Sequence, residues 1–189
     1  MNKVKQQKWD DCYKNADIAT AAAATILKNN AHLLPSTAHA LDVACGRAGN
    51  AQFLANKGFT VDAFDFSPNV IAALKHFVPD SINPQLWNSE SDTLRQAHYD
   101  VIVVSYFLQR DLFPALIAAL KEGGLLFYQT WSQQCVDSSG PSNPDFRLQR
   151  GELLSLCTDL RIVYYREEGK LGDIRLGSRN DAYLIAEKC

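Results

Sequence analysis

The chain has 189 residues, of which 47% are hydrophobic and 21% are charged, and this composition is typical of one soluble globular domain. The formal net charge is −2 and the lysines and arginines are scattered, so the basic surface of a nucleic-acid-binding protein is not expected. The apolar runs "ATAAAATIL" and "VIVVSYFL" are too short to cross a bilayer, and the start "MNKVKQQKWDDCYK" has no apolar signal core, so a membrane protein is not predicted.

The first predicted element is a helix near residues 6–29, an Ala-rich stretch without proline or glycine that carries Trp9 and Tyr13 on one face. The segment "LLPST" ends this helix, and "HALDVA" then has the apolar character of a short buried strand. Strands joined by helices predict a parallel α/β sheet that is covered on both faces. The elements that follow are helix 50–57, strand 59–65, helix 68–78, strand 84–88, strand 99–106, helix 111–122 and strand 124–131.

The final third of the chain departs from this alternation. The stretch "SQQCVDSSGPSNPDFRLQR" is rich in turn residues, and so long a loop in a compact domain often serves as a functional lid. After a short predicted helix at 151–158, "RIVYYREEGK" and "RNDAYLIAEK" alternate apolar and polar residues without a helix between them. These two segments predict an antiparallel closing hairpin, and no repeat, linker or second domain is indicated.

The cysteines give no prediction of a metal site. Their spacing contains no C-x-x-C pair and no other metal-ligand pattern, and an odd number without a secretory signal is typical of reduced thiols in the cytoplasm. Cys45, which precedes Gly46, is expected to be a small packing residue. The five are Cys12, Cys45, Cys135, Cys157 and Cys189.

The stretch "LDVACGRAGNAQFLANKGFTVDAFDFS" places a glycine-containing loop between a buried strand and a helix. Such a loop lies at the carboxyl edge of a parallel sheet, where open α/β folds bind ligands. Gly46 and Gly49 allow close approach of a ligand and positive φ angles, and the helix that begins near Asn50 offers unpaired N–H donors. Asp65 ends the next strand, where it suits a ribose diol; the alternative is a packing turn with a solvated Asp65.

Two features distinguish between nucleoside cofactors. The loop reads "GRAGNA" rather than the G-x-G-x-x-G that binds a dinucleotide pyrophosphate. Asp42 lies inside the strand before the loop, where a carboxylate is unfavourable near pyrophosphate but suits a cationic ligand or the loop's own amides. S-adenosylmethionine carries a sulfonium, an ammonium and a carboxylate but no phosphate, and it is therefore the predicted cofactor.

With these motifs the chain resembles the class I S-adenosylmethionine-dependent methyltransferases. "LDVACGRAG" is similar to the first motif of that family, although Ala44 and Ala48 occupy two glycine positions and Gly49 comes one place late. "VDAFDFS" is similar to the second motif, and "YDVIVVSYFLQR" and "LKEGGLLFYQTW" match later strands. The resemblance covers most of the chain and implies a Rossmann-like, doubly wound α/β sheet of seven strands, mostly parallel, with a C-terminal antiparallel hairpin.

The resemblance also implies a set of cofactor-binding residues. Asp65 is expected on the ribose hydroxyls and Phe66 against the adenine, and Ser67 with Pro68 suits a helix start. "WNSES" lies where the family usually has an Asp beside the adenine amino group, so Asn88, Ser89 or Glu90 is expected to make that contact, and Asn88 is favoured. The expected set is Asp42, Ala44, Cys45, Gly46, Arg47, Gly49, Asn50, Asp65, Phe66, Asn88, Ser89 and Ser105.

A narrower similarity, carried by "WDDCY", "ACGRAGNAQFLANKGF" and "GPSNPDFRLQRGELL", is to small-molecule methyltransferases of the tellurite-resistance and thiopurine type. It implies that Trp9 and Tyr13 help to cover the substrate pocket; the alternative is an aromatic pair packed in the core. The single domain then divides into an N-terminal helical cap (1–35), a cofactor-binding core (36–132) and a substrate loop with the closing hairpin (133–189).

Residues after the fourth strand face the expected position of the transferable methyl group. Tyr106 and Arg110 are the candidate catalytic and substrate-binding residues, because either side chain can bind an anionic group of an acceptor. For Arg110 the alternative is a surface charge at the start of the next helix. Further candidates for orienting the acceptor are Ser105, Gln109, Cys135, Asp137, Asn143 and Arg147. The four histidines, His32, His39, His76 and His98, do not fall on the expected ligand edge.

The predicted activity is in-line methyl transfer to a small-molecule acceptor, a reaction that often needs only alignment of the two reactants. The protein is expected to be a monomer or a homodimer. A nucleic-acid methyltransferase is disfavoured because the chain has "SYFL" where [DN]-P-P-[YFW] follows the fourth strand. A nicotinamide dehydrogenase is disfavoured by the glycine pattern. The remaining alternative is a non-catalytic module that binds S-adenosylmethionine and regulates a partner.

Overall fold

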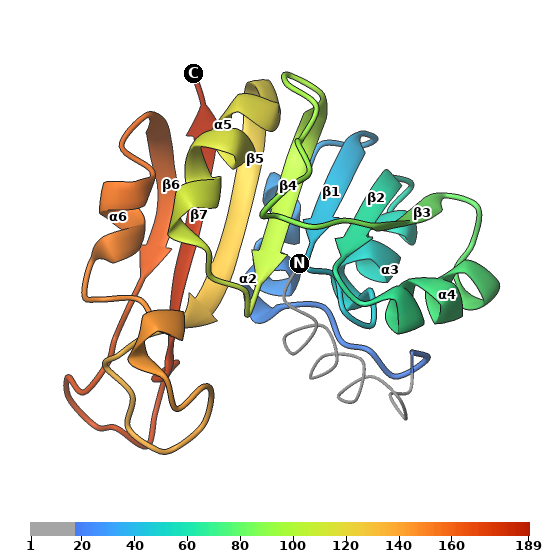
Figure 1. The fold of residues 1–189 in the computed structure, drawn as a ribbon. Helices are drawn as coiled ribbons and strands as arrows, with labels where there is room; N and C mark the ends of the chain where they lie inside the picture. Colours follow the sequence, from blue (N-terminus) through green and yellow to red (C-terminus); the bar gives the residue numbers. More distant parts are fainter. Residues whose placement is uncertain (1–17) are drawn as a thin grey trace.

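The computed structural model describes residues 18–189, which form a seven-stranded sheet with the order β3-β2-β1-β4-β5-β7-β6 (Figure 1). Strands β1 to β5 pair in parallel, and β7 pairs antiparallel with both β5 and β6. The predicted doubly wound sheet with an antiparallel closing hairpin is therefore confirmed. The strands are β1 (His39–Val43), β2 (Thr60–Asp65), β3 (Ile82–Leu86), β4 (Tyr99–Ser105), β5 (Leu120–Trp131), β6 (Leu160–Arg166) and β7 (Asp181–Lys188).

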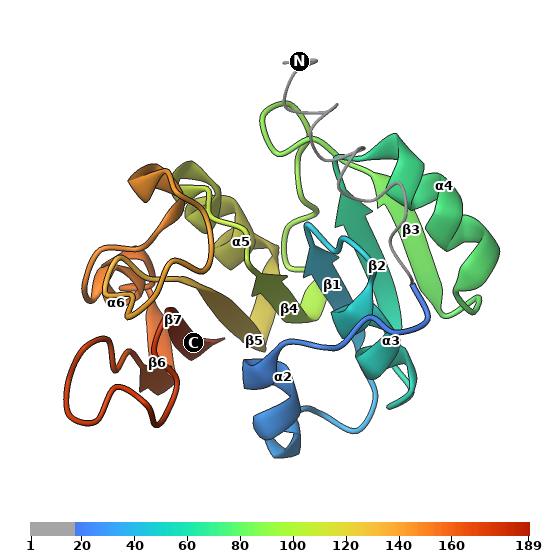
Figure 2. The ribbon, with the colours of Figure 1, turned by 90° about the horizontal axis from the view of Figure 1, so that it is seen from below.

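Helices pack on both faces of the sheet, and each face carries its own apolar cluster. One cluster joins Ile26, Leu54 and Leu74 to the sheet, and the other joins Phe113 and Leu153 to its opposite face. Figure 2 separates α2 and α3 from α5 in this way. The helices are α2 (Thr25–Asn29), α3 (Gly49–Ala55), α4 (Pro68–Phe77), α5 (Phe113–Ala119) and α6 (Glu152–Leu156), with the 3-10 turns η1 (Ala31–Leu33), η2 (Arg110–Leu112) and η3 (Pro144–Phe146).

The start of α4 follows directly from the local sequence. The Ser67 hydroxyl accepts a hydrogen bond from the Val70 N–H at 3.3 Å, and Pro68 occupies the first turn, where its missing N–H costs nothing. Val70 and Leu74 are both buried on one face of the helix. Among the described residues, no helix has the length and apolar character needed to span a membrane.

The predicted helix at 6–29 is wrong over residues 18–24, which run without helical structure before the short α2. The Ala-rich composition favours a helix, but this segment is bound to the rest of the fold instead. The Asn50 side chain accepts the Ala24 N–H at 2.8 Å, and a Cβ on Gly49 would lie only 2.4 Å from the carbonyl oxygen of Ala22. Close tertiary contact thus overrides helix propensity here. Residues 6–17 of the predicted helix lie outside the described residues, which begin at residue 18.

Two further boundaries differ from the prediction. The third strand begins at Ile82 rather than 84, and the helix predicted at 111–122 is a 3-10 turn followed by α5, which ends at Ala119. Leu120 already belongs to β5 and pairs with Tyr99, so the "KEGG" segment lies within a strand rather than in a turn after a helix. The glycines in this segment are typical of a turn, which explains why the sequence pattern gave the wrong boundary.

Candidate functional site

The carboxyl ends of β1, β2, β4 and β5 meet at one edge of the sheet and surround a cavity of about 410 Å³. This edge is where open α/β folds bind ligands. A cavity of similar volume, about 380 Å³, lies at the opposite edge beside Asp100 and Glu122 and includes none of the expected cofactor-binding residues. The cavity at the carboxyl edge is lined by Ala21, Ala22, Ala44, Cys45, Gly46, Arg47, Gly49, Asn50, Asp65, Phe66, Ser105, Tyr106, Phe107 and Trp131.

The loop after β1 owes its shape to three left-handed residues in alternation. The φ angles are 54° at Ala44, 50° at Gly46 and 59° at Ala48. The two alanines therefore adopt the conformation that glycine accommodates with less strain, at a cost of roughly 1–2 kcal/mol each. The substitutions noted in the first motif thus change the energy of the loop but keep its turn.

Asp65 connects this loop to the end of β2. One carboxylate oxygen accepts the Gly46 N–H at 2.8 Å, and the other accepts the Ser67 N–H at 2.9 Å. Asp65 therefore fixes the backbone of the first motif and belongs to the cavity wall beside Phe66.

Asn50, at the start of α3, joins three separate parts of the chain. Its amide nitrogen donates to Asp42 Oδ1 at 3.1 Å and to Ser105 Oγ at 2.9 Å, and its oxygen accepts the Ala24 N–H. Asp42 also accepts the Ala51 N–H at 3.1 Å through its other oxygen. The sequence left Asp42 open to a cationic ligand or to the loop's own amides; in the structure it is fully buried behind the cavity wall and accepts from two amides at the start of α3.

Burial raises the pKa of Asp42 from 3.8 to about 7. The hydrogen bonds from Asn50 and Ala51 lower this pKa in part, and the negative charge of Asp65 raises it further. The folded protein therefore holds this proton more tightly than the unfolded chain does. Protonated Asp42 therefore stabilises the folded protein fully below pH 4, and this stabilisation is lost as the pH rises to about 7.

We expect the free energy of unfolding of the wild type, relative to an Asp42→Asn variant, to fall between pH 4 and 7 by up to about 1.4 kcal/mol per pH unit. Subtracting the variant removes the contributions of titrating groups that do not interact with Asp42. Denaturant unfolding at pH 4, 5, 6 and 7 measures this difference. A difference that stays constant or grows with pH would contradict the assignment.

Tyr106 follows β4 and has an unusual conformation for a tyrosine, with a φ angle of 55°. Its ring packs against Trp131 with 5.0 Å between centroids, and both side chains line the cavity. Its hydroxyl donates to Asp181 at 3.0 Å and accepts from the Gln129 amide at 2.8 Å. Burial and the nearby Asp181 carboxylate raise the pKa of Tyr106, so the phenol is a poor base near neutral pH.

Arg110 does not line the cavity, in contrast to its predicted role in binding substrate. Its guanidinium donates twice to the Glu152 carboxylate, at 2.5 and 3.0 Å, and also to the carbonyl oxygens of Asp145 and Arg147. The sequence left a surface charge as the alternative to substrate binding, but in the structure Arg110 is paired with Glu152 and with two backbone carbonyls. Arg110, the first residue of η2, thus attaches the start of α6 and the segment before it to the turn that precedes α5.

Nine of the twelve expected cofactor-binding residues line the cavity, and three do not. Asp42 lies behind the wall, as described above. The side-chain oxygen of Asn88 accepts the Glu90 N–H at 3.0 Å, and the Ser89 hydroxyl donates to Gln109 at 2.5 Å. Trp9 and Tyr13 lie outside the described residues.

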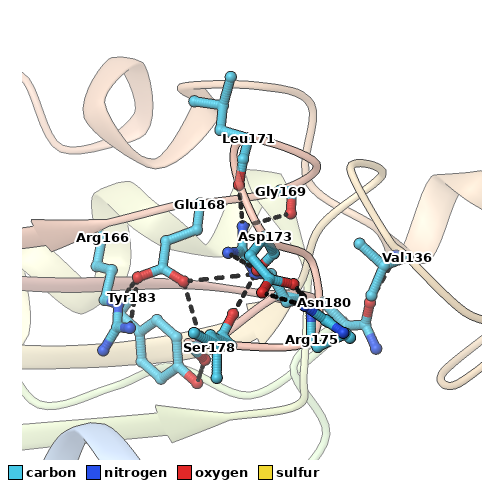
Figure 3. A network of polar contacts seen from close by, with 12 residues as sticks. Val136, Arg166, Glu168, Gly169, Leu171, Asp173, Arg175, Ser178, Asn180 and Tyr183 are labelled. Carbon is cyan, nitrogen blue, oxygen red and sulfur yellow. Dashed lines mark hydrogen bonds and ion pairs between the residues drawn. The ribbon is translucent and has the colours of Figure 1, made fainter.

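The long segment after β5 and the loop between β6 and β7 form one unit beside the cavity. Asn180 joins them, because its side chain accepts the Val136 N–H and donates to Asp137, both at 2.8 Å (Figure 3). Arg147 donates to the carbonyls of Ser132 and Pro141 and lies over Trp131. Arg179 binds four carbonyls of its own loop, those of Gly169, Leu171, Asp173 and Leu176.

Four cavity residues were missed from the sequence. Trp131 ends β5, so the argument that placed Ser105 at the carboxyl edge of β4 applies to it equally. Phe107 adjoins the candidates after β4. The remaining two, Ala21 and Ala22, had no detectable signal, since their segment was predicted to be helical.

Comparison with known proteins gives one family. The methyltransferase domain family matches residues 15–165, which is most of the chain. No match was found among curated protein sequences.

Solved structures with the same fold share little sequence with the chain. An S-adenosylmethionine-dependent methyltransferase from Mesorhizobium loti has a TM-score of 0.70 at 15% identity, covering 91% of this chain and all of that one. TehB from Haemophilus influenzae has a TM-score of 0.70 at 21% identity, covering 98% of this chain and 67% of that one. A TehB-like S-adenosylmethionine-dependent methyltransferase from Corynebacterium glutamicum has a TM-score of 0.63 at 16% identity, with both chains fully covered.

Proposed function

The chain belongs to the methyltransferase domain family, and from this premise we propose that it transfers the methyl group of S-adenosylmethionine to a small-molecule acceptor. The observation that carries the proposal is the cavity at the carboxyl edge, with the first two motifs on one wall and aromatic side chains on another. Its volume of about 410 Å³ falls within the range usual for small-molecule sites.

The residues around this cavity fit the cofactor. Positive φ angles at Ala44 and Gly46 turn the first motif tightly and favour close approach of a ligand to its backbone. Asp65 is oriented by two loop amides, which supports a role in accepting hydrogen bonds from ribose hydroxyls. Phe66 adjoins it on the same wall and suits contact with a purine ring. Asn50 donates a hydrogen bond to Ser105 and so fixes its side chain within the cavity lining.

When bound, S-adenosylmethionine supplies an electrophilic methyl group on a sulfonium. The protein's part is then to hold an acceptor in line with that group and to exclude water, effects that are worth several kcal/mol. Tyr106 and Trp131 form a packed aromatic wall that suits both tasks.

The titratable side chains on the cavity wall argue against a general base. Burial raises the pKa of Cys45 well above its ordinary value, and the Tyr106 phenol is similarly affected. No histidine, lysine or glutamate belongs to the described lining. We therefore propose an acceptor that brings its own nucleophilic lone pair, such as a thiolate, an amine or an oxyanion.

We further propose that the chain forms a single domain divided at about residues 35 and 132 into a cap, a cofactor-binding core and a substrate segment. The interlocked loops after β5 and between β6 and β7 support the last of these divisions. A cytoplasmic location and a monomeric or homodimeric state complete the proposal.

The proposal is tested with methyl-labelled S-adenosylmethionine and a panel of small thiols, amines, hydroxy acids and metalloid oxyanions, beside DNA and RNA. We expect transfer to at least one small-molecule class and none to nucleic acid. Tight cofactor binding without transfer to any small molecule would favour a regulatory binding module, and transfer to DNA or RNA would overturn the acceptor class.

A further inference from the structure

Two histidines and an aspartate gather at the amino edge of the sheet, opposite the candidate cofactor cavity. His39 begins β1, His98 immediately precedes β4, and Asp62 belongs to β2. One ligand atom from each side chain lies within 4.8 Å of the other two, and His39 Nε2 is 3.4 Å from Asp62 Oδ2. None of these residues has a part in the proposed methyl transfer.

The carboxylate of this cluster is held in a fixed orientation. Asp62 is buried, its Oδ1 accepts from the Asn83 amide at 2.9 Å, and its Oδ2 accepts from the Tyr99 hydroxyl at 3.0 Å. The Tyr99 ring also packs against both imidazoles, with centroids 5.1 Å from His39 and 4.9 Å from His98. Hydrogen bonds that orient a ligating carboxylate from behind are a regular feature of protein metal sites.

We propose that His39, Asp62 and His98 bind a divalent transition-metal ion of the Zn²⁺ type. A tetrahedral ion about 2.1 Å from each ligand holds its ligand atoms about 3.4 Å apart, and this is the separation of His39 and Asp62. Closing a 4.8 Å separation to that value takes a shift of about 1.4 Å. His98 is partly exposed and lies in the turn before β4 rather than within a strand.

The ligand set indicates the class of metal. Imidazole nitrogens suit Zn²⁺, Ni²⁺ and Co²⁺ better than Mg²⁺ or Ca²⁺, which prefer oxygen ligands. The ion would join β1, β2 and the turn before β4, which are three separate segments of the chain. Its effect is therefore to stabilise the edge of the sheet that lies away from the cofactor.

The surroundings of His98 provide a test that distinguishes a metal site from a cluster with a purely structural role. The exposed guanidinium of Arg95 lies 3.3 Å from His98 Nε2, where its positive charge opposes the binding of a metal ion to the imidazole. Lys121 adds a second positive charge but is paired with Asp100 at 2.9 Å. Replacing Arg95 with glutamine should therefore tighten metal binding.

The experiment is calorimetric titration of the chelator-treated, full-length protein with Zn²⁺. We expect one site per chain, at least about 100-fold weaker binding for His98→Ala, and several-fold tighter binding for Arg95→Gln. His76→Ala, at an exposed position on α4, is the matched control and should bind like the wild type. Thermal unfolding with and without Zn²⁺ gives a second readout, since a ligand that binds the folded state raises the melting temperature.

A measurement on the wild type tests the same site without depending on whether a variant folds. Added Co²⁺ should broaden the imidazole NMR signals of His39 and His98 but not those of His32 and His76, without a thiolate charge-transfer band. Absence of binding, or binding that persists in His98→Ala or carries a thiolate band, would overturn the proposal.

Discussion

Replacing Asp65 with alanine should weaken S-adenosylmethionine binding about 10- to 100-fold. The charge-assisted hydrogen bonds that this carboxylate is proposed to make with the ribose are worth about 1.5–3 kcal/mol, and each 1.4 kcal/mol is a factor of ten. The variant also removes the acceptor of the Gly46 and Ser67 N–H groups, so the backbone of the first motif loses its orientation. We therefore expect the loss to lie at the upper end of this range, measured by isothermal titration calorimetry.

Asp80→Ala serves as the control for this experiment, because Asp80 is exposed in the turn before β3 and should leave the affinity unchanged. Asp65→Asn keeps the size of the side chain and should give an intermediate loss. Circular dichroism verifies that each variant is folded. If folded Asp65→Ala binds the cofactor as tightly as the wild type, the ribose assignment is wrong.

Replacing Asn50 with alanine should lower the free energy of unfolding by about 2–5 kcal/mol, since each buried polar group left without a partner costs about 1–3 kcal/mol. The variant removes the acceptor of the Ala24 N–H and the donor to both Asp42 and Ser105. The segment before α2 then loses a main attachment to the cofactor loop. Denaturant unfolding monitored by circular dichroism measures the effect.

Asn56→Ala is the matched control for Asn50, at the exposed C-cap of the same helix. It should change the free energy of unfolding by less than about 0.5 kcal/mol. Equal effects of the two substitutions would show that the buried network around Asp42 contributes little to stability.

The central part of the fold was predictable because its signals are local. Short apolar strands separated by helices determine a parallel sheet, and the pair Ser67–Pro68 fixes the start of α4. The argument that strand ends meet at one edge also placed Asp65 and Ser105 beside the first motif. These inferences need only the periodicity of the chain and the topology of the open α/β fold.

The errors arose where distant contacts override local preference. Residues 18–24 have the composition of a helix, but the Ala24 N–H donates to the Asn50 side chain and the Ala22 backbone packs against Gly49. Arg110 stays a prediction as an anion-binding group, and in the structure its guanidinium is paired with Glu152, 42 positions further along the chain. The sequence alone does not report which partner a long charged side chain reaches.

The cluster at the amino edge illustrates the same limit. Three positions far apart in the sequence, 39, 62 and 98, have no metal-ligand spacing and become neighbours only when β1, β2 and β4 align. Sequence reasoning correctly removed the histidines from the ligand edge. It had no means of bringing two of them together with Asp62.

The most direct test of the whole account is to titrate the wild-type protein with S-adenosylmethionine, its demethylated product S-adenosylhomocysteine, NAD⁺ and NADP⁺. The loop after β1 and the carboxylate of Asp65 together predict saturable binding of the first two and none of the dinucleotides. Binding of a dinucleotide with no response to S-adenosylmethionine or its product would contradict the account at its foundation.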